Sequence, residues 1–214
     1  MRTDNEPTAY LIGNIPFLDA IIFLDSRPPE TEYWVEKALE EITARAQAYA
    51  HARISLLDLC AGSGCIGVAV LQALPNAHVD FCEINVGHHN TIRKNILENN
   101  IDPSRARIFG SDLFSEVAKI SPQYDFILTN PPYIDPKRID RVQKSVLDYE
   151  PSRALFGGTN GMEYIARILT DAPPYLAKRG VLYIEHEPEQ TTAIHTLASS
   201  LPYTSCKTYP DRNV

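Results

Sequence analysis

Asn130, Pro131, Pro132 and Tyr133 are the residues of this chain most suited to chemistry, and they directly follow an apolar run at 124–129. Two successive prolines lack a backbone N–H, so a strand that reaches them cannot continue its hydrogen-bond ladder. Each proline also favours extended backbone at the residue before it. We therefore expect a rigid turn with an amide at one end, an aromatic ring at the other and free carbonyl oxygens between. Such a turn suits the binding of a planar amine.

A second segment with chemical potential is rich in glycine. Gly62, Gly64 and Gly67 fit the pattern Gly-x-Gly-x-x-Gly, and Glu83 follows about 20 residues later. Glycines let the backbone approach a ligand closely, and a carboxylate after the next strand can accept both ribose hydroxyls of an adenosine cofactor. NAD would place its pyrophosphate at the helix N-terminus that follows. S-adenosylmethionine would need an anion for its ammonium group, which Asp58 could supply if it does not serve as a turn carboxylate.

The turn at 130–133 distinguishes between these two cofactors. The side-chain oxygen of Asn130 and the carbonyl oxygen of Pro131 can accept both N–H bonds of an NH₂ group. Tyr133 can stack on the same planar group, or it can face the core. Rigid placement of the nitrogen against a methyl donor lowers the barrier to methyl transfer, and acceptor dipoles match the positive charge that develops on nitrogen. These residues favour S-adenosylmethionine over NAD.

The elements that must position these residues alternate between strand and helix. Apolar runs predict strands at 54–59, 78–83, 106–110, 124–129, 181–185 and 203–209. Helical spacing predicts helices at 31–50, 65–74, 86–99, 113–119, 162–176 and 188–200, with Thr31 at the start of the first. Such alternation is typical of an α/β fold with a mainly parallel sheet and helices on both faces. Ligands of such sheets bind beyond the carboxyl ends of the strands, where Asp58, Glu83, Asp112 and Asn130 all lie.

Asp112 follows the third predicted strand and has two interpretations. Its carboxylate could accept a hydrogen bond from the amine of adenine, with Leu113 and Phe114 packing on the ring. It could equally cap the short helix predicted at 113–119. Upstream of the alternating region, residues 1–30 are irregular, with one or two short strands expected at 17–24.

The composition excludes several classes of protein. The 214 residues carry a formal net charge of −7, which argues against binding a nucleic-acid backbone over a wide surface. The chain has no apolar run of membrane-spanning length and no signal or transit peptide, so we expect a cytoplasmic protein. The four cysteines form no zinc-binding pattern, and we expect them to be reduced and structural, with no metal bound; they are Cys60, Cys65, Cys82 and Cys206.

At this point the chain resembles the HemK-like protein-(glutamine-N5) methyltransferases, which act on peptide chain release factors. The Asn-Pro-Pro-Tyr and glycine-rich motifs are shared with DNA adenine and RNA guanine methyltransferases, whereas the flanking pieces are specific to this family. The matching segments are Glu6-Pro7, Tyr10-Leu11-Ile12-Gly13, Pro29-Glu30-Thr31-Glu32, Asp58 to Gly64, Ser111 to Phe114, Asn130 to Ile134, Glu150-Pro151, Ala154-Leu155, Gly157-Gly158, Asn160-Gly161, Gly180, Glu185-His186-Glu187 and Gln190.

The resemblance implies a Rossmann-like class I fold that depends on S-adenosyl-L-methionine. It implies methyl transfer to the side-chain amide nitrogen of the glutamine in a release factor's Gly-Gly-Gln motif. The cofactor would be bound by Asp58, Cys60, Ala61, Gly62, Ser63, Gly64, Glu83, Asp112, Leu113 and Asn130. The glutamine amide would be bound by Asn130, Pro131, Pro132 and Tyr133, of which Asn130, Pro131 and Tyr133 act in catalysis. The alternative function is methylation of an amino group of adenine or guanine, and a cofactor-binding scaffold without turnover is a third.

The resemblance also bears on domain organisation. Residues 1–30 would be a linker or hairpin that remains of the family's helical N-terminal domain, and residues 31–214 the methyltransferase domain. The chain stops at Val214, before the antiparallel strand with which the family's sheet normally finishes, so the sheet is expected to lack that strand. We expect a monomer that has a release factor as its protein substrate, binds nucleic acid in no stable way and makes no contact with a membrane.

Overall fold

A computed structural model describes residues 13–24, 31–48, 53–120, 122–141 and 152–209. Within these ranges, five strands form one sheet in the order β5-β4-β3-β6-β7, and every neighbouring pair is parallel. The sheet confirms the predicted α/β class. The strands are β3 (Ile54–Leu59), β4 (Ala77–Glu83), β5 (Ala106–Gly110), β6 (Tyr124–Thr129) and β7 (Leu176–Ile184).

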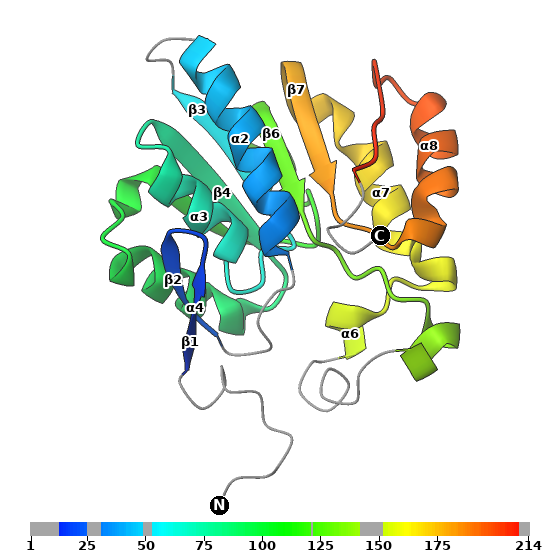
Figure 1. Cartoon of the computed structure of the whole chain (residues 1–214), viewed down its shortest axis with the longest axis horizontal. Coiled ribbons are helices and arrows are strands. Elements are labelled where there is room, and N and C mark those ends of the chain that lie inside the picture. Colours follow the sequence, from blue (N-terminus) through cyan, green and yellow to red (C-terminus); the bar gives the residue numbers. More distant parts are fainter. Residues whose placement is uncertain (1–12, 25–30, 49–52, 121, 142–151, 210–214) are drawn as a thin grey trace, which may run out of the picture.

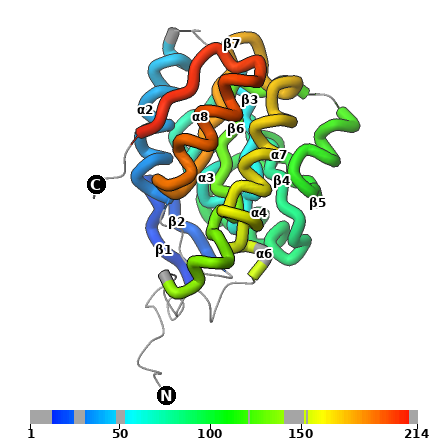
Figure 2. The backbone as a smooth tube through the Cα atoms, turned by 90° about the vertical axis from the view of Figure 1, so that its right-hand side faces the viewer, coloured from blue at the N-terminus to red at the C-terminus, as the bar shows by residue number. Residues whose placement is uncertain are grey.

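Helices cover both faces of this sheet (Figure 1). Side chains alternate along the strands: Leu56 and Phe126 belong to one apolar cluster, while Leu57 and Ile127 belong to another on the opposite face. The first cluster packs against α2 (Glu32–Ala48), α3 (Cys65–Ala73) and α4 (Val86–Glu98). The second packs against α7 (Glu163–Asp171), with α8 (Thr191–Ser199) beside it, as Figure 2 shows.

Shorter elements connect these helices and strands. They are the helical turn α6 (Ser152–Leu155) and the 3₁₀ turns η1 (Pro103–Arg105), η2 (Val117–Lys119), η3 (Pro136–Arg141), η4 (Thr159–Gly161), η5 (Pro173–Tyr175) and η6 (Pro188–Gln190). In the part of the chain that the structure describes, no helix has the length and apolar character needed to cross a bilayer.

An N-terminal hairpin precedes the sheet. Its strands are β1 (Asn14–Phe17) and β2 (Ala20–Phe23), which pair antiparallel. Phe17, Ala20 and Ile22 are buried in the same apolar cluster as α3 and α4, so the hairpin packs on the body of the molecule. The domain boundary that we expect at residue 30 stays a prediction.

The predicted strands at 54–59, 106–110 and 124–129 are confirmed with their bounds, but the strand predicted at 203–209 is wrong. Residues 204–209 are exposed and have no strand conformation. The segment is held instead by side chains: the Tyr203 hydroxyl donates to the carbonyl oxygen of Leu169 at 2.7 Å, and Thr208 Oγ1 lies 2.8 Å from His195 Nε2. A β-branched and aromatic run forms a strand only where a neighbouring edge pairs with it.

Two predicted helices are also shorter than expected. In place of a helix at 113–119, the structure has only η2, because Ser111 Oγ donates to the carbonyl oxygen of Leu113 at 2.6 Å and accepts from Glu116 N at 3.1 Å. Such side-chain bonds compete with helix formation. The helix predicted at 162–176 ends at Asp171, because Pro173 and Pro174 cannot continue it, and β7 begins already at Leu176.

Asp80 and Tyr124, which are buried, form a polar network with Arg107 that leads to a prediction about stability. Asp80 in β4 accepts two hydrogen bonds from Arg107, at 2.7 and 2.6 Å, and a third of 2.6 Å from the hydroxyl of Tyr124, which is fully buried. We expect Tyr124→Phe to lower the free energy of unfolding by about 1.5–3 kcal/mol, since it removes a donor to a buried charge. Urea unfolding followed by circular dichroism measures this loss.

Tyr183→Phe is the matched control. Its hydroxyl donates to Glu41 at 2.7 Å, but that carboxylate is 39% exposed and can bind water instead. The control should therefore lose clearly less stability than Tyr124→Phe. Equal losses of unfolding free energy in the two variants would show that burial of the Asp80 carboxylate does not set the cost of losing its donor.

Candidate functional site

The strand order reverses between β3 and β6, and the predicted site residues gather at that point. β4 and β5 extend to one side of β3, and β7 extends to the other side of β6. Leu59 is in register with Thr129, whose hydroxyl donates to the carbonyl oxygen of Leu59 at 2.7 Å. The chain segments that leave these two strands therefore start side by side. In a sheet of this kind, the crevice beyond the reversal point is where ligands bind.

The glycine turn, residues 60–64, occupies the end of β3. Cys60, Gly62 and Gly64 have φ values of +61°, +54° and +78°, and only glycine takes such values without strain. The strained Cys60 thus lies at the end of β3, beside the point where the strand order reverses, and backbone strain is often found at functional sites. A Cβ atom added to Gly62 would meet nothing within 4 Å, so the turn has an open side that a ligand could approach.

Glu83 at the end of β4 is held against this turn. Its Oε2 atom accepts a hydrogen bond from the backbone N–H of Gly62 at 2.8 Å, and its Oε1 atom accepts one from Asn85 N at 2.7 Å. Each carboxylate oxygen can accept a further bond. The arrangement fixes the carboxylate beside the turn and leaves it able to receive the two hydroxyls of a ribose.

Asp58 lies beneath the same turn, and half of its carboxylate has no partner. Oδ2 accepts a hydrogen bond from Gly67 N at 2.9 Å, while Oδ1 is buried without a hydrogen bond. Burial raises the pKa of Asp58 well above its ordinary value; the Gly67 N–H opposes this rise and the charge of Glu83 adds to it. An orphaned buried carboxylate oxygen fits the ammonium group of S-adenosylmethionine, which would pair with it.

We expect Asp58→Asn to separate stability from cofactor binding. Because the folded pKa is raised, ionisation of Asp58 opposes folding: the penalty is absent below the ordinary value of 3.8 and grows as the pH rises toward the folded pKa. The neutral amide has no such penalty. The stability of the variant relative to the wild type should therefore increase as the pH rises above 3.8 toward the raised pKa, and the variant should bind S-adenosylhomocysteine at least roughly tenfold more weakly. Urea unfolding and calorimetry measure the two effects.

Asp102→Asn is a control of opposite sign. Hydrogen bonds from Ser104 lower the pKa of Asp102, so this carboxylate stabilises the fold above its unfolded pKa and that stability is lost as the pH falls through the folded pKa. The control variant should lose stability relative to the wild type as the pH rises. A stability difference for Asp58→Asn that is the same at every pH would contradict the raised pKa.

The acceptor turn, residues 130–133, leaves the end of β6 and is oriented by residues distant in sequence. Asn130 Nδ2 donates to the hydroxyl of Thr31 at 2.8 Å, which directs Oδ1 of the same amide away from Thr31. Thr31 is buried and immediately precedes α2, as predicted. The hydroxyl of Tyr133 donates to Glu185 Oε1 at 3.0 Å, and Trp34 Nε1 donates to the other oxygen of Glu185 at 2.6 Å. Glu185 thereby links the turn to α2.

Glycines and one amide side chain brace the backbone of the acceptor turn. A Cβ atom at Gly157 would lie 2.5 Å from the carbonyl oxygen of Pro132, and one at Gly161 would collide with the carbonyl oxygen of Tyr133. Gln190 Nε2 donates to that same carbonyl oxygen at 2.8 Å. Because backbone packs directly on backbone here, only glycine fits at these two positions.

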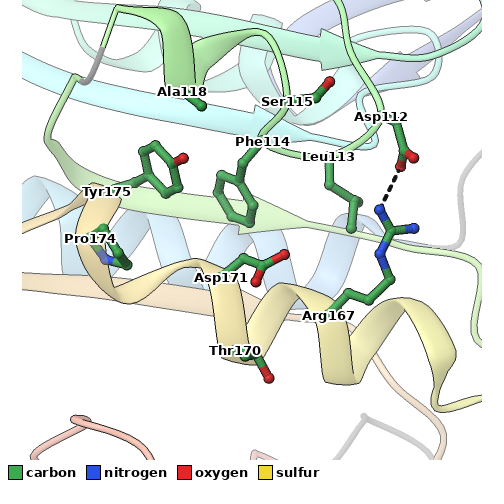
Figure 3. Close-up of a pocket in the computed structure, with 10 residues that line it drawn as sticks. All are labelled: Asp112, Leu113, Phe114, Ser115, Ala118, Arg167, Thr170, Asp171, Pro174 and Tyr175. Atoms are coloured by element: carbon green, nitrogen blue, oxygen red, sulfur yellow. Dashed lines mark hydrogen bonds and ion pairs between the residues drawn. The ribbon is translucent and has the colours of Figure 1, made fainter.

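Asp112 and Leu113 lie at the edge of an open pocket of about 410 Å³ between the β5–β6 connection and α7 (Figure 3). Asp112 Oδ1 accepts a hydrogen bond from Arg167 Nη2 at 3.1 Å, and Leu113 is buried with a φ of +48°. The ring of Phe114 stacks on that of Tyr175, with centroids 4.7 Å apart. Phe114 therefore packs against the η5 turn on this side of the sheet.

The cysteines do not form part of the reactive groups. All four are free thiols, as predicted. Burial raises the pKa of Cys60, Cys65 and Cys82 to about 12 in each case. Thiols with such pKa values stay protonated at neutral pH and are poor nucleophiles.

The sequence predicts the glycine turn, Glu83, Asp58 and the acceptor turn at one edge, and the structure brings them together there. The sequence does not predict a site role for Trp34, Thr31 or Glu185, although their hydrogen bonds hold the acceptor turn. The one signal for Thr31 and Glu185 is that both belong to motifs that carry the family resemblance. Several other motif residues lie outside the described ranges: Glu6-Pro7, Tyr10 to Ile12, Pro29-Glu30 and Glu150-Pro151.

Comparison with known proteins first defines the class of protein to which this chain belongs. The family model for the "Methyltransferase small domain" matches residues 41–150. Among solved structures, a SAM-dependent methyltransferase from Agrobacterium tumefaciens superposes with a TM-score of 0.59 at 13% identity, covering 86% of this chain and 56% of that one. The fold and the matched domain define a Rossmann-like class I methyltransferase that depends on S-adenosylmethionine.

Curated relatives then narrow this class of protein to one family. A release factor glutamine methyltransferase of Leptospira interrogans is 32% identical over 90% of this chain, and the chain spans 66% of its length. One of Geobacter sulfurreducens is 31% identical over 99% of this chain, which spans 72% of that relative. The chain belongs to the release factor glutamine methyltransferase family, which confirms the resemblance drawn from its motifs.

Proposed function

We propose that this protein transfers a methyl group from S-adenosylmethionine to the side-chain amide nitrogen of the glutamine in a release factor's Gly-Gly-Gln motif. The observation that carries the proposal is the orientation of Asn130. Its amide donates to Thr31 and so presents Oδ1 as an acceptor, at the point where the sheet reverses and beside the glycine turn. The curated relatives are named for this activity.

The residues around the glycine turn would hold the cofactor, which supplies an electrophilic methyl group on its sulfonium. Glu83 would accept the ribose hydroxyls, and Oδ1 of Asp58 would pair with the ammonium group. Asp112 would accept from the adenine amine beside Leu113. The backbone of Cys60, Ala61, Gly62, Ser63 and Gly64 would line the side on which the cofactor lies, with Asn130 completing it.

The acceptor turn would hold the glutamine amide. Oδ1 of Asn130 and the carbonyl oxygen of Pro131 would each accept one N–H of the amide, and the ring of Tyr133 would pack on its plane, next to Pro132. Amide nitrogen is a poor nucleophile, so orientation has to supply much of the rate: holding two reacting groups in line contributes roughly 7–11 kcal/mol in favourable cases. The two acceptors also stabilise the positive charge that develops on nitrogen.

A labelled-methyl assay tests this function directly. The protein is incubated with methyl-labelled S-adenosylmethionine and a release factor, or with the same factor carrying Gln→Ala in its Gly-Gly-Gln motif. Label should enter only the first factor. Equal labelling of both factors would overturn the proposal, and label in RNA or DNA but not in release factor would show an amino-group methyltransferase of nucleic acid.

The proposed substrate also indicates where the protein acts and with which partner. Release factors work with ribosomes, so we propose that the enzyme acts in the cytoplasm, with a release factor as its protein partner. We propose that it does so as a monomer. Light scattering of the purified protein measures its mass in solution, and a mass of twice 24.0 kDa or more would contradict this.

A further inference from the structure

Two asparagines on α4 pair with the outer edge of the N-terminal hairpin. Asn95 Oδ1 accepts from Phe23 N at 2.8 Å, and Asn95 Nδ2 donates to the carbonyl oxygen of Phe23 at 3.0 Å. Asn99 does the same with Ile21, at 2.9 and 2.8 Å. Each asparagine thus takes the place of a peptide group in a neighbouring strand.

The spacing of the two pairs follows from the geometry of helix and strand. Residues four apart on a helix are separated by about 6 Å along its axis, and residues two apart on a strand by roughly 6.6 Å. Ile21 and Phe23 direct their N–H and C=O groups outward, while Ile22 between them is in register with Ile15 of β1. The α4 helix therefore continues the hairpin's hydrogen-bond ladder with side chains.

Only one of the two asparagines also forms a hydrogen bond with the proposed cofactor site. Asn95 Nδ2 also donates to the carbonyl oxygen of Ser63 in the glycine turn, at 2.9 Å. The second bond of Asn99 Nδ2 returns to the carbonyl oxygen of Asn95 in its own helix, at 2.7 Å. Asn95 is completely buried, so its amide has no water to replace a lost partner.

We propose that Asn95 is a positioning residue through which the pairing of Phe23 with α4 and the binding of the cofactor stabilise each other. The two bonds to Phe23 fix the plane of the Asn95 amide, and that plane fixes the direction of the bond to Ser63. The bond to the carbonyl oxygen of Ser63 in turn fixes the orientation of the peptide group that joins Ser63 to Gly64. Coupling between two sites is reciprocal, so a cofactor that orders the turn must also strengthen the hairpin's bond. The inference rests on the proposed cofactor site and not on the methyl acceptor.

Hydrogen exchange in the unmodified protein tests this coupling with an internal control. The exchange of single amides is measured with and without saturating S-adenosylhomocysteine. The amide of Phe23, held by Asn95, should exchange several-fold more slowly with the ligand bound, and the amide of Ile21, held by Asn99, should change much less. Equal slowing of both amides, or of neither, would overturn the proposal.

Matched variants provide the second test. Asn95→Ala and Asn99→Ala each remove a pair of bonds to the hairpin, but only the first removes the bond to Ser63. Calorimetry on the folded variants should show about tenfold weaker binding of S-adenosylhomocysteine for Asn95→Ala and less than about twofold for Asn99→Ala. Equal affinities of the two variants for S-adenosylhomocysteine would overturn the proposed coupling but not the proposed cofactor site. A wild-type protein that binds no S-adenosylhomocysteine would overturn the proposed cofactor site as well.

Discussion

Replacement of Asn130 by alanine should lower kcat for release factor methylation by about 10²–10³, the usual effect of losing one preorganised group that stabilises developing charge. The side chain is expected to contribute one of two acceptors for the substrate amide, and without it the nitrogen is free to rotate away from the methyl donor. Steady-state kinetics with labelled S-adenosylmethionine measure the loss. Calorimetry with S-adenosylhomocysteine should show a much smaller change, since Glu83 and the glycine turn remain.

Thr31→Val is the matched control for this prediction. Valine has the shape of threonine but cannot bond to Asn130 Nδ2, a contact of 2.8 Å. The acceptor then remains present but is less well oriented, so we expect kcat to fall by about tenfold, less than for Asn130→Ala. An Asn130→Ala enzyme with undiminished kcat would show that the Asn130 amide does not hold the substrate.

Substitution of Gly161 by alanine should nearly abolish methylation of the release factor while the cofactor still binds. Gly161 has a φ of +68°, and an added Cβ would collide with the carbonyl oxygen of Tyr133 and with Gln190 Nε2. The backbone of the acceptor turn has to move to relieve this. Displacement of a substrate-holding group by about 1 Å can cost roughly 100-fold in rate, so we expect a loss of at least that size in kcat/KM.

Gly13→Ala separates the collision from the backbone strain. Gly13 has a φ of +76°, but a Cβ there would meet nothing within 4 Å. Both variants should lose about 1–2 kcal/mol of stability from the left-handed backbone, whereas only Gly161→Ala should lose activity beyond that. If the two variants have the same kcat/KM, the contact between Gly161 and Tyr133 has no part in positioning the substrate.

The strands were predictable because of how they are buried. Strands in the middle of a parallel sheet are covered on both faces, so Ile54–Leu59 and Tyr124–Thr129 read as nearly continuous apolar runs. Their ends coincide with residues that cannot continue a strand, such as Pro131. The chemistry of the site was predictable for a related reason, since parallel strands bring all their carboxyl ends to one edge.

The wrong predictions share a cause. The run at 203–209 has strand-like residues, but none of the strands in the described residues pairs with it. At 113–119 the helical pattern was outweighed by two bonds of the Ser111 hydroxyl. In both places a local preference of a few tenths of a kcal/mol per residue met a contact worth about 1 kcal/mol or more. Local patterns carry no information about such contacts.

The amino-acid order was enough to establish which groups could do chemistry: an anion and glycines for a cofactor, and a proline-stiffened amide for an amine. The orientation of those groups depends on contacts between residues that are far apart in the sequence and close together in the folded protein. Thr31 reaches Asn130 across 99 positions, Trp34 reaches Glu185 across 151, and Phe23 reaches Asn95 across 72. Periodicity and spacing describe neighbours within a few residues, whereas these bonds arise only when the packed sheet brings distant segments within 3 Å of each other.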